Sequence, residues 1–467
     1  MSGVRLTWVQ PEDLLPHELR QAAEDGRDAA AVAARWTAAG GSLRPGAGGA
    51  SPVPAPPHLR ALARRLLDEL AALAPPSADR EPTGLAAIAR ACAPARPPEP
   101  PARGPGRSAL HAAWLGRAVG CLLGKPVEKL PLDGIRRIAR ATGNWPLHTW
   151  FTARGLPADI AAAHPWNRRS APTSLAENID GMPEDDDLNY PLLGLLLLQR
   201  HGPAFTTDDV ARLWLDELPA GRTFTAERVA YRNLLDGVEP PHTATHRNPF
   251  REWIGAAIRA DVHGWTHPGD PWAAAAQAHR DAVLTHTANG VYGAMFNAAA
   301  IALAAGGAHD VHGCLDGALA VIPPRSRLAD AVRLGIALAR AEPGFDTVVD
   351  RLHTALGAYH WVHAVPNAAL LAAALTHADG DFSGSICRAV SGGWDTDSNG
   401  ATAGSLAGLL AGHPDALPGR WTAPLKNRLA TSVTGFDGVG FDTLAELTAR
   451  LTPQQPHPHT PQEVRSA

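Results

Sequence analysis

The spacing of apolar residues along the chain predicts a protein built almost entirely of α-helices. From about Ser108 to Leu451, long runs rich in alanine and leucine are separated by short polar segments, and the alternation typical of β-strands is rare. Examples are SALHAAWLGRAVGCLLG, YPLLGLLLLQRHG and ATAGSLAGLLAG. Alanine and leucine are the strongest helix formers among the apolar residues. We therefore predict one large all-α domain over residues 108–451.

Residues 1–74 have a different pattern and predict a small separate unit. Val4–Val9 is typical of a short strand. Pro11–Ala39 is helical in composition and ends at Gly40-Gly41, a helix C-cap signal. An amphipathic helix follows, because leucines recur at steps of three and four at Leu59, Leu62, Leu66, Leu70 and Leu73.

Proline sets apart two further segments. The prolines of residues 75–107 predict an extended, semi-rigid linker in which only Gly84–Cys92 has the composition of a short helix. The polar, proline-rich segment 452–467 predicts a disordered tail. The chain is thus expected to consist of a small unit, a linker, a large helical domain and a tail.

Composition excludes several classes of protein. The chain has 467 residues and a formal net charge of −4, which gives no support to a protein that binds nucleic acid or acidic membranes through bulk charge. Its four cysteines are far apart and form no CxxC pair, so we expect no disulfide framework. The first residues lack the apolar segment of a signal peptide, and apolar runs such as Leu192–Leu198 fall far short of the ~20 residues of a membrane span. We expect a cytoplasmic protein without a membrane partner.

Two acidic segments carry most of the chemical information. Glu184–Asp187 precedes an apolar helix expected over 189–200, and Asp395-Thr396-Asp397-Ser398 lies at the start of a helix expected over 399–410. Acids near helix N-termini are common, because they complement the helix dipole. However, two carboxylates ~5 Å apart repel by about 3 kcal/mol at an effective dielectric constant of ~20. No Lys or Arg lies within several residues of either segment, so a distant arginine, a shared proton or a divalent cation must compensate.

The sequence suggests how the two segments meet. Gly400, Gly404 and Gly408 recur every four residues on one face of the second helix. Glycine weakens a helix, so three on one face indicate that another backbone passes very close. If this contact brings Asp395 and Asp397 against Asp185–Asp187, the acids face each other across a metal site. Oxygen ligands favour Mg²⁺, Mn²⁺ or Ca²⁺ over zinc.

Four segments, in order, resemble the ADP-ribosylglycohydrolase family, which includes the dinitrogenase-reductase-activating glycohydrolases. They are GRAVGCLLGKPVE (116–128), EDDDLNY (184–190), AHRDAVLTHTANGVYGAMFNAAAIALA (278–304) and GGWDTDSNGATAGSLAG (392–408). The resemblance covers roughly residues 108–412. It implies a compact all-α domain that holds two divalent cations, Mg²⁺ or else Mn²⁺, in a central cleft. Residues 1–107 lie outside it.

The resemblance also implies roles for individual residues. The implied metal ligands are Asp185, Asp186, Asp187, Asp395, Asp397 and Ser398, where Asp185 replaces a family Thr or Ser. Glu128, which closes the first segment, is the implied acid/base, with Asp185 and Asp186 as further catalytic carboxylates. The predicted substrate contacts are Trp394, His286, Asn289 and Gly290.

Three positions depart from the family pattern and bear on the substrate. Cys121 stands where many members have Asp, Leu188 replaces a Thr, and Trp394 replaces a Gly directly before Asp395. An indole at this point either stacks on a substrate ring or narrows the cleft.

The implied reaction is hydrolysis of the N- or O-glycosidic bond of ADP-ribose in an ADP-ribosylated protein or a related small molecule. A second hypothesis is a non-catalytic module that binds ADP-ribose or a nucleotide. A third, less favoured one is a terpene-synthase-like enzyme, since Asp185-Asp186-x-x-Asn189 resembles a diphosphate-binding motif. The matching second motif is missing, and aromatic residues make up only 6% of the chain.

Overall fold

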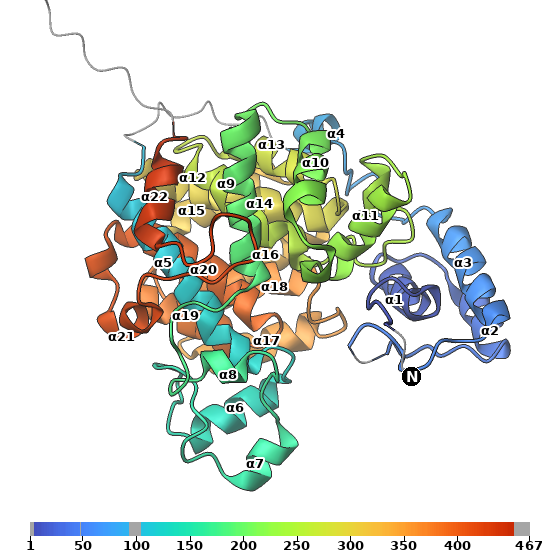
Figure 1. Cartoon of the computed structure of the whole chain (residues 1–467), viewed down its shortest axis with the longest axis horizontal. Coiled ribbons are helices and arrows are strands. Elements are labelled where there is room, and N and C mark those ends of the chain that lie inside the picture. Colours follow the sequence, from blue (N-terminus) through green and yellow to red (C-terminus); the bar gives the residue numbers. More distant parts are fainter. Residues whose placement is uncertain (1–3, 47, 93–103, 453–467) are drawn as a thin grey trace, which may run out of the picture.

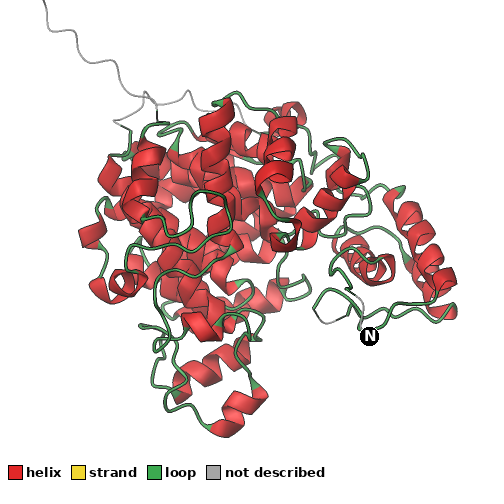
Figure 2. Ribbon diagram, viewed as in Figure 1, coloured by secondary structure: helices red, strands yellow, loops and turns green. Residues whose placement is uncertain are grey.

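The computed structural model describes residues 4–46, 48–92 and 104–452, and in them every extended regular element is a helix (Figures 1 and 2). Isolated bridges such as Trp253–His363 are the nearest approach to a sheet in these ranges. The all-α prediction is therefore confirmed. The predicted strand at Val4–Val9 is wrong, because this segment is a loop in which the Trp8 amide donates to the Gly49 carbonyl at 2.6 Å.

The large domain contains most of the helices. In chain order they are α5 (Arg107–Gly124), α6 (Leu132–Ala141), α7 (Ala158–Ala163), α8 (Ala171–Ser174), α9 (Asp186–His201), α10 (Thr207–Glu217), α11 (Thr225–Leu235), α12 (Asp261–Trp265), α13 (Pro271–Ala282), α14 (Ala288–Gly306), α15 (Val311–Ala318), α16 (Arg327–Ala341), α17 (Phe345–Leu356), α18 (Ala364–His377), α19 (Phe382–Ser391), α20 (Thr396–Ala411), α21 (Gly419–Thr422) and α22 (Phe441–Ala449). Short 3₁₀ helices are η1 (Lys125–Val127), η2 (Ala220–Arg222), η3 (His242–Ala244), η4 (Ile254–Arg259), η5 (Leu319–Val321), η6 (Pro414–Ala416) and η7 (Ala423–Leu425).

The centre of the large domain is a tightly packed antiparallel pair, α5 and α20. A Cβ added to Gly404 would overlap the carbonyl of Gly116, and one added to Gly400 would overlap the carbonyl of Gly120. The expected close approach of a second backbone is therefore confirmed, and its partner is α5. The pairing places the C-terminal end of α5 beside the N-terminal end of α20, where the Thr396 hydroxyl donates to the Gly124 carbonyl at 2.9 Å.

Helix α14 is the one described helix long and apolar enough to cross a membrane. Within the fold, 94% of the apolar window that passes this test is buried, which is typical of a core helix. All four cysteines are free, in agreement with the prediction of no disulfide framework.

The N-terminal unit consists of α1 (Pro11–Glu24), α2 (Ala30–Ala38) and α3 (Pro57–Ala71). The single helix expected over 11–39 is broken after Glu24, where Gly26 adopts a positive φ of 79°. Leu14, Trp36 and Leu66 form a second hydrophobic core that also includes Phe250 and Trp253 of the large domain. The unit thus packs against the side of the molecule that carries α11 (Figure 1).

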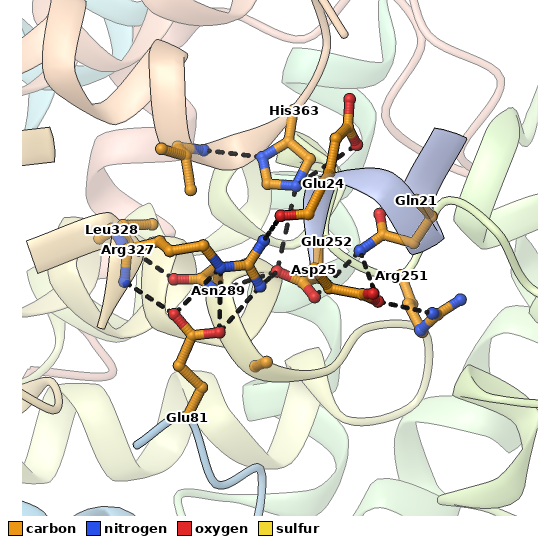
Figure 3. Close-up of polar contacts among 12 residues, drawn as sticks. Gln21, Glu24, Asp25, Glu81, Arg251, Glu252, Asn289, Arg327, Leu328 and His363 are labelled. Atoms are coloured by element: carbon orange, nitrogen blue, oxygen red, sulfur yellow. Dashed lines mark hydrogen bonds and ion pairs between the residues drawn. The ribbon is translucent and has the colours of Figure 1, made fainter. Parts of the chain in front are cut away.

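Buried ion pairs reinforce this contact (Figure 3). Glu252 accepts from the Gln21 amide of α1 at 3.1 Å and from Arg327 at 2.7 Å. Arg327 also pairs with Glu81 at 2.8 Å. Because each of these charges has a partner of opposite sign, their burial is tolerated.

The first part of the segment predicted to be an extended linker is packed against the large domain. Residues 76–92 lie against the large domain and include α4 (Leu85–Ala91). The Tyr292 hydroxyl donates to the Pro82 carbonyl at 2.5 Å, and His279 contacts the Thr83 carbonyl at 2.8 Å. This part of the chain is a packed strap rather than a spacer. Residues 93–103 and the predicted tail from 453 onward lie outside the described residues.

Candidate metal centre

Three helix ends meet at the acidic segments. Helix α9 begins at Asp186, and its N-cap Asp185 accepts a hydrogen bond from the Asp187 amide at 2.9 Å. Helix α20 begins at Thr396 with Asp395 as its N-cap residue. Both helices start three residues earlier than the sequence predicted, so the acids form the first turns themselves.

The two acidic segments face each other, as the sequence predicted. The Ser398 hydroxyl of α20 donates to a carboxylate oxygen of Asp187 in α9 at 3.2 Å. Asp187 is 1% exposed, and Asp395 and Asp397 are each 7% exposed. The fold therefore concentrates carboxylates from distant parts of the chain in one largely buried centre.

Two cations, Arg117 of α5 and Lys125 at the start of η1, also enter this centre, and sequence reasoning missed both. Arg117, which is fully buried, donates to a carboxylate oxygen of Asp187 at 3.1 Å and of Asp261 at 2.7 Å. Lys125 forms an ion pair with Asp185. The signal that could have found them is the four-residue spacing of Arg117, Cys121 and Lys125, which places them on one face of the helix.

Cys121 makes the ligand set less uniform than the sequence suggested. Its thiol sulfur and the carboxylate oxygens of Asp185 and Asp187 lie within 4.8 Å of one another. The possible donor atoms of the centre are therefore not all oxygen. Burial, together with these carboxylates, raises the pKa of the Cys121 thiol well above its usual value.

Electrostatics in the centre favour added positive charge. Burial, followed by repulsion from the neighbouring acids, raises the pKa values of Asp186 and Asp395 well above the usual range. Asp397 is raised to a pKa of about 7 by burial and by the charges of Glu128 and Asp185. Burial would also raise the pKa of Asp185, but the Lys125 ammonium outweighs it and lowers that pKa. Most of these carboxyl groups would thus hold a proton unless a cation replaced it.

Asn367 of α18 positions the second acidic segment. Its side-chain oxygen accepts from the Asp395 amide at 3.1 Å and from the Asn399 side chain at 2.7 Å. Its own amide donates to the Trp361 and His363 carbonyls. Asn367 therefore fixes the start of α20 relative to α18.

Glu128 lies just after η1, at the edge of the centre. It is half-buried, accepts from the Asn167 amide at 2.6 Å and pairs with the exposed Lys129 at 2.7 Å. A carboxylate held in place yet reachable from solvent is suited to proton transfer.

Trp394 is held by a neighbouring ring. Its backbone has a positive φ of 54°, and its indole stacks on His353 with ring centroids 4.0 Å apart. His353 in turn contacts the Gly392 carbonyl at 2.8 Å. One indole face is therefore already covered, and the side chain supports the backbone directly before Asp395.

The other predicted substrate residues belong to different surroundings. The Asn289 amide donates to Glu252 at 2.9 Å, within the cluster that docks the N-terminal unit (Figure 3). His286 is fully buried beside Thr285, and a Cβ on Gly290 would meet the Arg251 carbonyl. Within the described residues, no hydrogen bond or ion pair joins these three to the acidic centre. Leu188 is buried in the core.

A cavity of about 370 Å³ lies beside the centre and reaches it through Glu184. Its lining includes Asp180, Met182, Arg428 and Asp437. Glu184 itself pairs with Arg222 at 2.9 Å. The first residue of the acidic run is therefore a wall of this cavity.

The sequence model of the ADP-ribosylglycohydrolase family matches residues 103–459. A solved structure described as an ADP-ribosylglycohydrolase-related protein complex is 21% identical, covers 74% of this chain and 99% of its own, and has a TM-score of 0.44. No curated protein matches the sequence. Because the family model spans well over half of the chain, the protein belongs to the ADP-ribosylglycohydrolase family.

Proposed function

We propose that the protein is a divalent-metal-dependent hydrolase that cleaves the glycosidic bond of an ADP-ribose conjugate. The observation that carries this proposal is the meeting of Asp187 and Ser398, which brings two acidic helix starts together. Membership of the ADP-ribosylglycohydrolase family supports the hydrolytic activity and the ADP-ribose moiety.

The donor set fits a pair of hard cations. Three cations, Lys125, Arg117 and Lys129, face seven carboxylates, which are Glu128, Asp185, Asp186, Asp187, Asp261, Asp395 and Asp397. Two divalent ions would balance the remaining four negative charges. Asp186, Asp187, Asp395, Asp397 and Ser398 would hold them, and Mg²⁺ or Mn²⁺ suits these oxygen ligands. When bound, such ions orient hydroxyl groups and make a water molecule more acidic.

The protein's own residues supply the remaining requirements of the reaction. Cleavage at the anomeric carbon passes through an oxocarbenium-like transition state, which needs a carboxylate to move a proton and negative charge nearby. Glu128, oriented by Asn167, is placed to exchange protons at the edge of the centre. The Lys125 ammonium lowers the pKa of Asp185, so this N-cap carboxylate stays ionised beside the centre.

The deciding experiment measures release of free ADP-ribose from an ADP-ribosylated protein, with Mg²⁺, with Mn²⁺ and with a chelator. We expect release that requires the divalent ion. Tight ADP-ribose binding without turnover would instead support a non-catalytic binding module, and pyrophosphate release from a prenyl diphosphate would support the terpene-synthase-like alternative.

The raised pKa of Asp397 predicts a pH dependence of metal binding. Because protons on Asp397, Asp186 and Asp395 compete with the cation, the apparent affinity for Mg²⁺ should fall as the pH decreases through 7, by at least about tenfold per pH unit. Calorimetric titration between pH 5.5 and 8.5 measures this, and an affinity independent of pH would contradict it.

The stability of the metal-free protein should decrease as the pH rises, whereas the affinity for metal increases. The folded protein holds the Asp397 proton more tightly than the unfolded chain does, so the resulting stability is fully present below about pH 4 and is lost as the pH rises through 7. Thermal unfolding in a chelator should therefore show a lower Tm at pH 7.5 than at pH 5.5, and Mg²⁺ should remove that difference.

A further inference from the structure

Arg228 in α11 is a buried cation without a counterion. Its side chain donates to the Thr7 hydroxyl at 2.5 Å and to the Gly221 carbonyl at 3.2 Å, and its guanidinium lies 5.5 Å from the Phe224 ring. The residue is only 9% exposed, and its Nε has no hydrogen-bond partner. No carboxylate among the described residues pairs with it. A guanidinium held in this way is costly unless an anion comes from outside the chain.

Other well-buried arginines of the large domain differ in this respect. Arg117 pairs with Asp187 and Asp261, and Arg259 pairs with Glu227 and Asp281. Those arginines therefore each contact two carboxylates, whereas Arg228 contacts none among the described residues.

Arg228 is linked to the first residue of the acidic run through one hydrogen bond and one ion pair. The Gly221 carbonyl, which accepts from Arg228, directly precedes Arg222, and Arg222 pairs at 2.9 Å with Glu184, the residue before Asp185. Helix α9 also faces Arg228 through Tyr190, one turn after Asp186, and the buried hydroxyl of Tyr190 has no partner.

A second arginine, Arg169, lies two residues after Asn167, on the segment that holds Glu128. Asn167, which holds Glu128, accepts from the Arg169 amide at 3.1 Å. The Arg169 side chain is exposed, makes no ion pair within the described chain and repels Arg228. Arg169 thus lies on the segment that holds Glu128, and Arg228 is hydrogen-bonded to the segment that holds Glu184, and neither guanidinium has a carboxylate partner among the described residues.

We propose that Arg228 and Arg169 bind the diphosphate of the substrate while its ribose lies at the metal centre. Guanidinium groups form strong paired hydrogen bonds with phosphate oxygens, and they remain charged at every physiological pH. Thr7 orients Arg228, so the N-terminal unit becomes part of the substrate site. This inference rests on the proposed function, because that function supplies the ADP-ribose moiety.

The test compares binding of ADP-ribose with binding of ribose, which lacks the diphosphate, to the full chain in Mg²⁺. In Arg228→Gln we expect ADP-ribose affinity to fall at least about tenfold and in Arg169→Gln several-fold, with ribose affinity unchanged in both. The matched control is Arg212→Gln on α10, whose arginine is exposed and pairs only with Asp209, and it should change neither affinity.

A second measurement covers the case in which Arg228→Gln does not fold. Pyrophosphate should then raise the Tm of the natural protein but not that of Arg169→Gln. Unchanged ADP-ribose affinity in Arg228→Gln, or a pyrophosphate effect independent of Arg169, would overturn the inference. If ADP-ribose binding depends on Arg228 but no conjugate is hydrolysed, the proposed activity fails and the diphosphate site stands.

Discussion

Replacing Asp186 with alanine should abolish divalent-metal binding and lower the rate of ADP-ribose release by at least about a thousandfold, while the fold survives. Asp186 accepts no hydrogen bond from the described residues, and the neighbouring acids destabilise its charged form. Without metal, the variant should be as stable as the natural protein or more stable, because removal of the Asp186 carboxylate relieves repulsion among buried carboxylates. Asp395→Ala should behave in the same way toward metal.

Asp187→Ala is the informative comparison. Asp187 accepts from Arg117 and Ser398, so its removal leaves a fully buried guanidinium with one carboxylate fewer. We expect this variant to lose metal binding and also about 2–4 kcal/mol of stability. Calorimetric metal titration and chemical unfolding measure both quantities. Full metal affinity in Asp186→Ala and Asp395→Ala would show that the metal centre has been assigned to the wrong residues.

Gly120→Ala should cause the second large effect, a loss of at least about 3 kcal/mol in the free energy of unfolding. A Cβ at this position would overlap the Gly400 carbonyl, and relief requires two helix backbones to move apart. Since α20 also carries Asp395 and Asp397, any variant that still folds should bind Mg²⁺ more weakly.

Gly194→Ala provides the matched control for this prediction. Gly194 is a buried glycine inside α9, but a Cβ there would meet Val262 at 3.6 Å, an ordinary contact. Alanine should leave the stability unchanged or raise it by up to about 1 kcal/mol through its higher helix propensity. Equal effects of the two substitutions in urea unfolding would rule out the backbone contact as the cause.

Some of the centre could be predicted because its signals are local. Gly400 and Gly404 cost helix stability wherever the helix lies, so they indicated a close backbone before that backbone was known. The acids of both segments repel their own neighbours, so they indicated a missing positive charge. The order of the four segments along the chain then indicated the family resemblance.

Other features could not be predicted because they depend on distances across the fold. His286 and Asn289 lie within the third family segment, and their side chains contact Thr285 and Glu252 rather than the acids. Lys125 and Cys121 were overlooked as neighbours of Asp185 because they lie 60 and 64 residues before it in the chain. The strap at Glu81–Thr83 has the composition of a linker, but its contacts with Arg327 and His279 hold it against the domain.

The sequence by itself determined the helical class, the acidic helix starts and the demand for a compensating charge, because propensity and repulsion act between residues that are near one another along the chain. Only the tertiary structure decided which groups meet that demand. The packing of α5 against α20 brings Arg117, Cys121 and Lys125 to the acids, and the docking of the N-terminal unit places Thr7 on Arg228. These contacts form between residues that are distant in sequence, and they depend on which side chains the complete fold buries together.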